Sequence, residues 1–403
     1  MALADANFRG YAEMLWKHYV FRRGIEVPAM WDQLFAHRPA RLLYIAGRSF
    51  DIRAQAAMNA FVDTVRVSGY DIRRADLLLV ELKAYQISQE LQQQAVQNAE
   101  DLEKKFRAMT DSQDVSVSNV LMSPAAGGDE ELSASNALRR GTEEVLQGIT
   151  DHTDIILDAS SLPRIAYLAL MTGLLSKLVP DKRAASPLLA NGKNLLVLVA
   201  EDASLDGKIQ AEDPNNDLVM IPGFSSALHA ESMQDWPLVW LPILGENRVS
   251  QLEKIMASVI PTNAEICPVL PHPSRDPRRA DRLLEEYRAP LFDARETPMT
   301  NILYAHEANP FEAYRQILGA MERYRESMGV IGGCRLVVTP LASKLISLGV
   351  GLACFELRPS DMKENYGIAI PLAEPMRYIV AMEDLHASKP ELSALLLTGD
   401  AYS

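Results

Sequence analysis

Cysteine is scarce in this chain, which has only Cys267, Cys334 and Cys354 among its 403 residues. None of them forms a CxxC pair and their number is odd, so a disulfide framework is excluded. This usage favours a reducing compartment, and we predict a cytoplasmic protein. The first residues lack the uncharged apolar core of a secretory signal, and no apolar run reaches the roughly 18 residues of a membrane span, so neither is predicted.

The chain also lacks an excess of positive charge, since its formal net charge is -13. A broad nucleic-acid surface is therefore excluded, because such surfaces are built from clustered Lys and Arg. A local basic pocket is still compatible with this charge. One basic, proline-rich stretch, "PHPSRDPRRADR", is predicted to be a solvated loop, with an acidic partner as the alternative.

The common nucleotide, metal and hydrolase signatures are absent as well. The sequence has no GxGxxG after its first predicted strand, no GxxxxGK[ST] and no GxSxG. It has no HExxH and no close Cys/His cluster, so no metal site is predicted. No cofactor is identified by these patterns.

What the sequence does contain is a succession of buried apolar strands, each followed by a turn and a helical pattern. With 48% hydrophobic residues, the chain is too long for a single core. Strands buried on both faces and alternating with helices predict an α/β fold with mainly parallel sheets. The predicted central strands are 41–47, 155–158, 195–200, 238–244 and 335–339.

The pattern restarts after a turn-rich stretch, which predicts two Rossmann-like halves. The predicted boundaries are an N-terminal helical segment at 1–38, a first half at 39–202, a linker at 203–224 and a second half at 225–403.

The two halves share a turn after their first strand. "YIAGRSFDIRAQ" and "PILGENRVSQ" both run from an apolar strand through a glycine-containing turn to an acid-x-Arg pair and a helix. Asp51 and Arg53 correspond to Glu246 and Arg248. This match, although short, indicates an internal duplication.

A second pair of turns matches late in each half. "DASSLPR" and "TPLASK" both follow an apolar strand with serine and one cation, and both precede a helix. Ser160, Ser161 and Arg164 correspond to Ser343 and Lys344.

All four turns lie at carboxyl ends of predicted strands, where open parallel sheets bind ligands. Helix N-termini there present free N–H groups and partial positive charge to an anion. We therefore expect at least three of the cations in these turns to converge on one cleft. The candidate ligand-binding residues are Arg48, Asp51, Arg53, Ser160, Ser161, Arg164, Arg248, Ser343 and Lys344.

A purely structural interpretation explains the same turns. Asp51 is a suitable N-cap with Arg53 as its partner in a corner, and "DASSLPR" is good capping chemistry. Duplicated halves also duplicate their caps, so the repeat alone does not decide between the two interpretations.

The motifs "GRSFDIRA", "LDASSLPR", "LVMIPGF", "PILGENR", "YAHEANPFEAY" and "TPLASKLISLG" together resemble a group of uncharacterised bacterial proteins. The chain departs from their pattern at Ala342, where glycine is usual. The resemblance implies duplicated Rossmann-like halves and no established activity. Because such proteins are sometimes found near defence genes, it also implies an antiviral defence setting.

Three functions follow as hypotheses. The first is a binding or sensor protein whose two halves close on a phosphorylated or nucleotide-like small molecule. The second is a transferase or hydrolase acting on a nucleotide or glycosyl phosphate, with Asp158, Glu246 or Glu307 as the catalytic acid or base. The third is an assembly subunit whose amphipathic helix at 87–109 binds a protein partner or a second copy, although a helix packed on its own half explains that pattern too.

Overall fold

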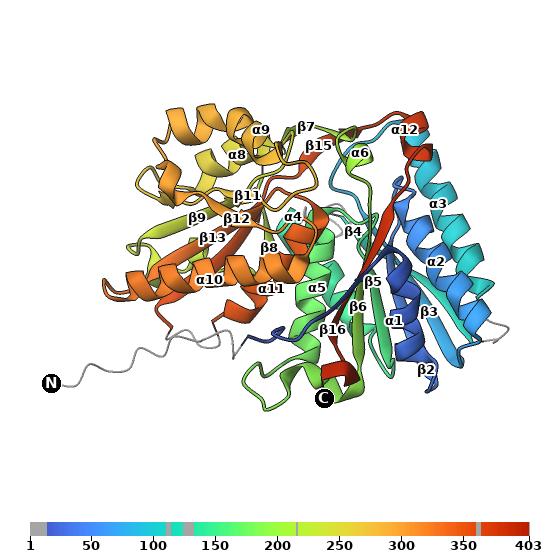
Figure 1. Ribbon diagram of the computed structural model, residues 1–403. Coiled ribbons are helices and arrows are strands. Elements are labelled where there is room, and N and C mark those ends of the chain that lie inside the picture. The colour runs from blue at the N-terminus through green and yellow to red at the C-terminus, as the bar shows by residue number, and fades with distance from the viewer. Residues whose placement is uncertain (1–13, 110–113, 124–132, 215–216, 360–363, 403) are drawn as a thin grey trace.

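The computed structural model describes residues 14–109, 114–123, 133–214, 217–359 and 364–402, and it contains two halves, each built on a mainly parallel sheet (Figure 1). In the first half five strands are parallel, and two more extend the sheet in antiparallel pairings. The parallel strands are β4 (Val115–Met122), β3 (Ile72–Leu82), β2 (Ala40–Gly47), β5 (Asp154–Asp158) and β6 (Asn194–Glu201); β16 (Glu391–Thr398) and β1 (Val20–Arg23) follow β6.

The second sheet repeats this plan. It has five parallel strands, an antiparallel strand beside β14, and a short strand that also pairs with β9. The parallel strands are β12 (Leu303–Ala305), β11 (Val269–Pro271), β9 (Leu238–Ile243), β13 (Cys334–Pro340) and β14 (Tyr366–Leu372); the others are β8 (Val219–Ser225) and β10 (Glu265–Ile266).

The predicted α/β fold with two Rossmann-like halves is therefore confirmed, and the five predicted strands are β2, β5, β6, β9 and β13. In each half the first parallel strand, β2 or β9, is central; the next parallel strands are added on one side of it, and the chain then crosses to the other side. This order creates a switch point between β2 and β5 in the first half and between β9 and β13 in the second. Ligands bind at such points in open α/β sheets.

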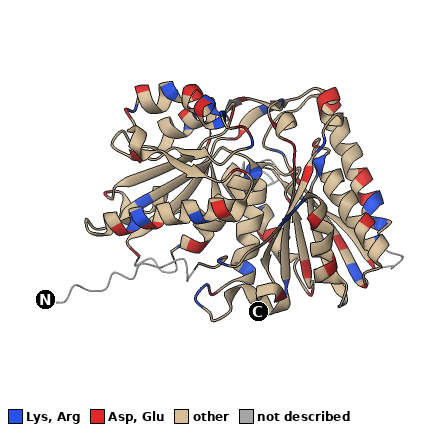
Figure 2. Cartoon of the chain, viewed as in Figure 1, with Lys and Arg blue, Asp and Glu red and all other residues tan. Residues whose placement is uncertain are grey.

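Helices cover both faces of each sheet, and the outer helices bear much of the charge that Figure 2 colours. On the first sheet, α1 (Val27–Phe35), α2 (Arg53–Ser68) and α3 (Gln89–Arg107) lie on one face, and α4 (Ala134–Gln147) and α5 (Arg164–Leu178) on the other. On the second sheet, α8 (Val249–Val259) and α9 (Arg279–Glu286) lie on one face, and α10 (Pro310–Gly329) and α11 (Lys344–Leu357) on the other.

Shorter elements complete the connections. They are α6 (Ala203–Asp206), α7 (Ser226–His229) and α12 (Met382–His386), 3-10 segments at Gly24–Glu26, Pro187–Gly192, Glu231–Met233, Met299–Asn301 and Asp400–Tyr402, and a π-helical turn at Arg288–Asp293.

Helices α5 and α11 join the two halves. Both are apolar on nearly all sides, as expected of helices buried between two sheets, and they pack against each other. Gly351 of α11 allows close approach, since a Cβ there would clash with the Met171 side chain of α5. One continuous hydrophobic core runs through these helices into both sheets. Rigid-body closure of the halves on a ligand, the response expected of a sensor, does not fit this shared core.

The chain crosses between the halves more often than the predicted boundaries allow. The predicted linker at 203–224 contains β7 (Gln210–Pro214), which pairs with β15 (Pro375–Ile379), and most of β8, which belongs to the second sheet. Strand β16 returns to the first sheet, so the second half does not run to residue 403. Strand β16 was not predicted because it lies after an irregular segment, and it pairs with the otherwise free edge of β6.

The predicted N-terminal helical segment at 1–38 is only partly helical in the described residues. Residues 20–23 form β1 against β16, and the only α-helix in the described part of this segment is α1. Trp16, Tyr19 and Phe21 pack on the second half, where the Tyr19 ring stacks on Phe311 with 4.6 Å between centroids. That contact favours an extended chain over the helix that the spacing suggested. Residues 1–13 lie outside the described part.

The helix predicted at 87–109 is α3, and its apolar face packs on its own half. Leu91, Leu102 and Phe106 are each no more than 2% exposed. This face is therefore not available to a partner, which removes the basis of the assembly hypothesis. In the described part of the chain, no helix is both long enough and apolar enough to span a membrane.

Candidate functional site

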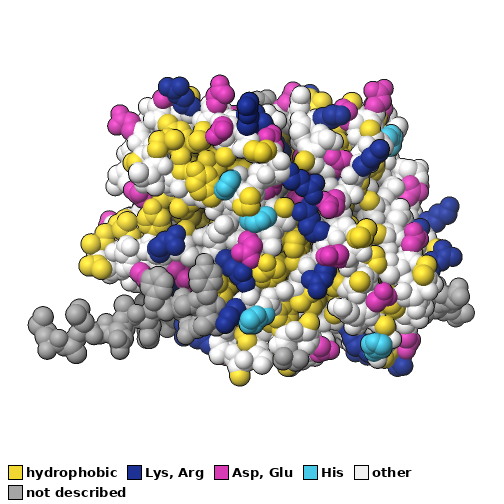
Figure 3. All heavy atoms as spheres, viewed as in Figure 1, with side chains coloured by type: hydrophobic (Ala, Val, Ile, Leu, Met, Phe, Trp, Pro, Cys, Tyr) yellow, Lys and Arg dark blue, Asp and Glu magenta, His cyan; other side chains and the backbone are white. Residues whose placement is uncertain are grey.

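The two switch points open into one cavity of about 520 Å³ between the halves. The turns after β2, β5, β9 and β13 all contribute to its lining, through Asp51, Arg164, Arg248 and Lys344 among others. In the space-filling view of Figure 3, Lys, Arg, Asp and Glu side chains gather along the junction between the halves. The duplicated turns therefore face each other across a shared site.

Helices α2, α5, α8 and α11 begin at this cavity, and each begins with a cation; α9 also begins there with Arg279, but it has Asp281 in its first turn. Arg53, Arg164 and Lys344 are the first residues of α2, α5 and α11, and Arg248 is the N-cap of α8. All four side chains line the cavity, as the sequence pattern predicted. None of the four helices has an acidic residue in its first turn.

This arrangement opposes the helix dipoles. A cation near a helix N-terminus costs about 0.3–1 kcal/mol, and the usual residues there are Asp and Glu. Helices α3 and α10 follow that rule, with Glu90 in the first turn of α3 and Glu312 in that of α10, whereas α1 and α4 have no acid in their first turn and no cation at their start. Since these four cations do not stabilise their helices and all line one cavity, their position indicates a role in the cavity.

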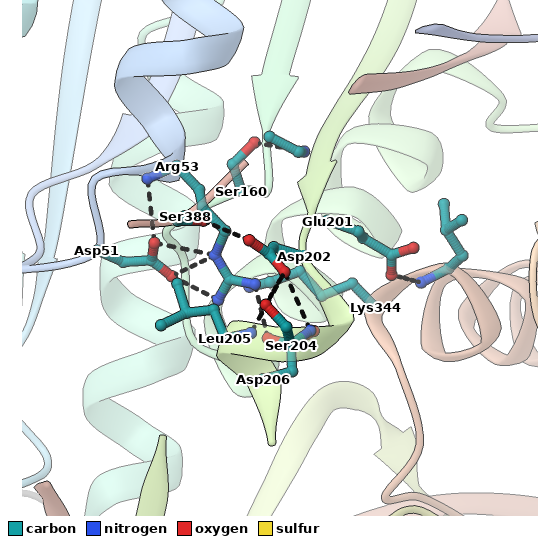
Figure 4. A network of polar contacts seen from close by, with 12 residues as sticks. Asp51, Arg53, Ser160, Glu201, Asp202, Ser204, Leu205, Asp206, Lys344 and Ser388 are labelled. Atoms are coloured by element: carbon teal, nitrogen blue, oxygen red, sulfur yellow. Dashed lines mark hydrogen bonds and ion pairs between the residues drawn. The ribbon is translucent and has the colours of Figure 1, made fainter. Parts of the chain in front are cut away.

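Arg53 is neutralised within the protein. Its guanidinium, only 3% exposed, lies between the carboxylates of Asp51 and Asp206, with N···O distances of 2.6 Å to each (Figure 4). Asp51 also accepts a hydrogen bond from the backbone N–H of Arg53. Burial raises the pKa of Asp51, but Arg53 outweighs it, and the pKa ends below its usual range. The corner interpretation thus describes Arg53 well.

Arg164 and Lys344 connect the halves reciprocally. Arg164 Nη2 donates to the backbone oxygens of Leu341 and Ala342 in the second half, at 3.2 and 2.7 Å. Lys344 Nζ donates to the backbone oxygen of Leu162 in the first half, at 2.8 Å. These contacts leave donors unused: Arg164 Nε is buried without a hydrogen-bond partner among the described residues.

Three cations in the cavity have no ion pair within 4 Å in the described residues: Arg164, Arg248 and Lys344. Burial, followed by repulsion from Arg53, lowers the pKa of Lys344 to about 8. Its ammonium also lies 5.2 Å from the centroid of the Tyr167 ring. Lys344 is therefore mostly charged at neutral pH, although its surroundings disfavour the charge.

Two carboxyl groups in the cavity also lack an ion pair in the described part of the chain. Glu201 accepts a hydrogen bond from the backbone N–H of Leu345 at 3.2 Å, and burial followed by the Asp206 charge raises its pKa to about 7. Glu374 is 5% exposed, and burial raises its pKa as well. Burial disfavours the negative charge of both groups, whereas three cations of the cavity have no ion pair in the described part of the chain.

The turns after β2 and β9 each contain a glycine, and the structure shows why a larger residue would not fit there. A Cβ at Gly47 would meet Ser161 Oγ at 2.7 Å, and a Cβ at Gly245 would clash with the backbone of Leu341 and Ala342. In each half, glycine lets the two turns of the switch point touch. These glycines therefore serve turn-to-turn contact.

Three predicted site residues lie outside the cavity lining. Arg48 Nε is 3.9 Å from a Glu81 oxygen. Asp158 is fully buried, where it accepts hydrogen bonds from the Tyr44 hydroxyl and the Ser160 backbone, and burial raises its pKa to about 6. Ser160 Oγ accepts from the backbone N–H of Ala200. Asp158 and Ser160 thus stabilise the turn, and neither side chain lines the cavity.

The two other predicted serines line the cavity but already have backbone partners. Ser161 Oγ donates to the backbone oxygen of Gly47, and Ser343 Oγ caps α11 by accepting from Ile346. Glu246 and Glu307 also line the cavity, and both bind Arg279, which holds the pKa of Glu246 below its usual range despite burial.

Sequence reasoning missed several residues of the site. Arg275, Arg279 and Arg282 line the cavity, although their stretch was predicted to be a solvated loop. The acids that pair with Arg275 and Arg279 lie far away in sequence, so no local pattern revealed these two residues, whereas Arg282 pairs with the nearby Asp276. Glu201 and Glu374 were missed because a single Glu after a strand is common.

Comparisons with known proteins give little further information. No protein-family model matches the chain, and no curated protein matches it. One solved structure, of a functionally unknown protein from Pseudomonas aeruginosa, is 11% identical and aligns with 88% of this chain and 96% of its own, with a TM-score of 0.22. At that TM-score the similarity carries no argument.

We predict that Glu201→Gln stabilises the protein in a pH-dependent way. The pKa of Glu201 is about 7 when folded against 4.5 as the ordinary value, so folding binds a proton between these pH values. Stability contributed by the protonated group is therefore lost as pH rises from 4.5 through 7. The free energy of unfolding of the variant, measured with urea, should therefore rise relative to that of wild type over this pH interval. The exposed Glu326→Gln is the control, and an equal gain there would contradict the assignment.

Proposed function

We propose that this protein binds a phosphorylated or nucleotide-like small anion in the cavity between its halves. The observation that carries the proposal is the set of four helix N-termini, each beginning with a cation and none with an acid in its first turn. Helix N-termini and cations both favour a negative ligand, and together they reproduce the chemistry of phosphate sites.

The unpaired cations support the same proposal. Like charges repel by about 1 kcal/mol at roughly 4 Å in water and by more where the dielectric is lower. The chain has ample carboxylates to neutralise Arg164, Arg248 and Lys344, given its net charge of -13, yet among the described residues none forms an ion pair with them within 4 Å. A bound anion would remove this repulsion.

The size of the cavity suits a small molecule. Ligand sites usually occupy about 300–1,000 Å³, and this cavity measures about 520 Å³. Because the halves share one core, we propose that the ligand acts by stabilising the junction through Arg164 and Lys344, which already connect the halves.

The enzymatic alternative, a transferase or hydrolase, has weaker support. Of its three candidate acids, Asp158 lies outside the cavity lining, and Glu246 and Glu307 are both bound by Arg279. A carboxylate held by an arginine is a poor proton donor near neutral pH. Glu201, whose pKa is about 7, is the better acid or base for such a reaction.

A thermal-shift screen tests the proposal. Wild type is melted with inorganic phosphate, sulfate, sugar phosphates and nucleotides, and a ligand at about 100 times its Kd should stabilise by about 2.7 kcal/mol. Arg164→Gln should abolish that shift, whereas Arg288→Gln, an exposed arginine outside the cavity lining, should retain it. The proposal fails if no anion shifts Tm, or if Arg164→Gln shifts as wild type does.

A further inference from the structure

Glu374 is the buried carboxylate that the fold does not explain. It lies between β14 and β15, lines the cavity, and is 5% exposed. Its Oε2 atom is buried and has no hydrogen-bond partner among the described residues. An unpartnered buried carboxylate is costly, because it loses its hydration without compensation. The group is therefore placed for a partner that the protein itself does not supply.

The charges around Glu374 locate it within the cavity. Its ionised form is favoured by Arg164 and Arg248. The charged neighbours that shift the pKa of Lys344 are instead Arg53, Asp51, Asp206 and Arg164. Arg164 is common to both sets, and all three side chains line the same cavity. Arg164 Nε is itself buried and without a hydrogen-bond partner in the described residues.

Aromatic rings accompany Glu374. Tyr378 and Tyr85 line the cavity with ring centroids 4.8 Å apart, and Phe50 lies 6.3 Å from Tyr378. Glu374 lines the same cavity as both tyrosines, and its charge adds to burial in raising the pKa of both hydroxyls. This side of the cavity offers flat apolar surface and a hydrogen-bond acceptor, whereas the side of Lys344 offers positive charge.

We propose that the anion is a nucleotide, with its phosphate held by Arg164 and Lys344 and with a base or ribose group donating a hydrogen bond to Glu374. The inference rests on the proposed function and assigns a specificity role to Glu374. Amino groups of bases and ribose hydroxyls are the donors that a carboxylate accepts, and aromatic rings stack on bases. Sulfate has neither feature, and it would leave Glu374 without a partner.

The test is calorimetric titration of wild type and Glu374→Leu. The ligands are the four nucleoside 5′-monophosphates, their 2′-deoxy forms, ribose 5-phosphate and inorganic phosphate. At least one nucleotide should bind wild type about tenfold or more tightly than inorganic phosphate. Glu374→Leu should lose about tenfold for that nucleotide and leave inorganic phosphate unchanged, and Glu374→Gln, which keeps an acceptor oxygen, should lose less. The deoxy forms distinguish a ribose donor from a base donor.

The outcomes separate this inference from the proposed function. If inorganic phosphate or ribose 5-phosphate binds as tightly as every nucleotide, the nucleotide assignment is overturned and the anion site stands. The same holds if Glu374→Leu binds the nucleotide like wild type. If no phosphate compound binds wild type, both fail. Should Glu374→Leu not fold, Tyr378→Phe and Tyr378→Leu give a matched pair: only the second should weaken nucleotide binding.

Discussion

Replacing Asp51 with alanine is expected to lower the free energy of unfolding by about 3–5 kcal/mol, because it leaves a buried charge without its main partner. Arg53 is only 3% exposed, and Asp51 receives its Nε, Nη2 and backbone N–H. Asp206 remains as a partner, but its side chain is 42% exposed and it binds a single nitrogen. Urea unfolding of wild type and variant measures the loss.

Two comparisons make this prediction specific. Asp206→Ala should cost about 1 kcal/mol or less, as exposed ion pairs do. The double variant Asp51→Leu/Arg53→Leu should recover most of the loss, since replacing a buried pair with apolar side chains is often neutral. A loss after Asp206→Ala as large as after Asp51→Ala would show that the burial of the pair does not set its energy.

Arg248→Ser is expected to make the protein more stable and a weaker binder at once. Serine is a favoured N-cap, and removing a cation from the start of α8 relieves the dipole, so the free energy of unfolding should rise by about 1 kcal/mol. The same change removes from the cavity a cation that has no ion pair in the described residues, and anion affinity should fall about tenfold or more. Urea unfolding and calorimetric titration with the best ligand of the screen measure the two effects.

A rise in stability together with a fall in anion affinity would distinguish a binding role of Arg248 from a structural one. If Arg248 served only the fold, its replacement would lower stability or leave it unchanged, and binding would follow the population of folded protein. Arg288→Ser outside the cavity should change neither quantity much. An unchanged affinity in Arg248→Ser would mean that this N-cap position does not contact the ligand.

The fold was largely predictable because its signals are local. Apolar strands buried on both faces, such as β5 and β6, alternate with helices, and that alternation indicates parallel sheets from sequence alone. The strands β1 and β16 were not predicted, because their pairing joins residues 20–23 to residues near the other end of the chain. A strand that completes a distant sheet leaves no local sign of its partner.

The candidate site was predictable only in outline. The duplicated turns identified Arg53, Arg164, Arg248 and Lys344, because a repeat marks equivalent strand ends and strand ends face one cavity. The turns did not show which cations are neutralised: Asp206 reaches Arg53 from a segment predicted to be a linker. Glu374 could not be identified from the sequence either, because it stands out only through its burial in the folded protein.

The most direct test of the central claim is the position of a heavy anion in a crystal of the protein. Selenate resembles sulfate in shape and charge and scatters anomalously, so its binding sites are located without assumptions about the ligand. We predict a strong anomalous peak inside the cavity, within hydrogen-bonding distance of Arg164 or Lys344. The opposite result is selenate peaks on other surfaces only, with an empty cavity at concentrations that saturate those surface sites. That result would contradict an anion site between the halves.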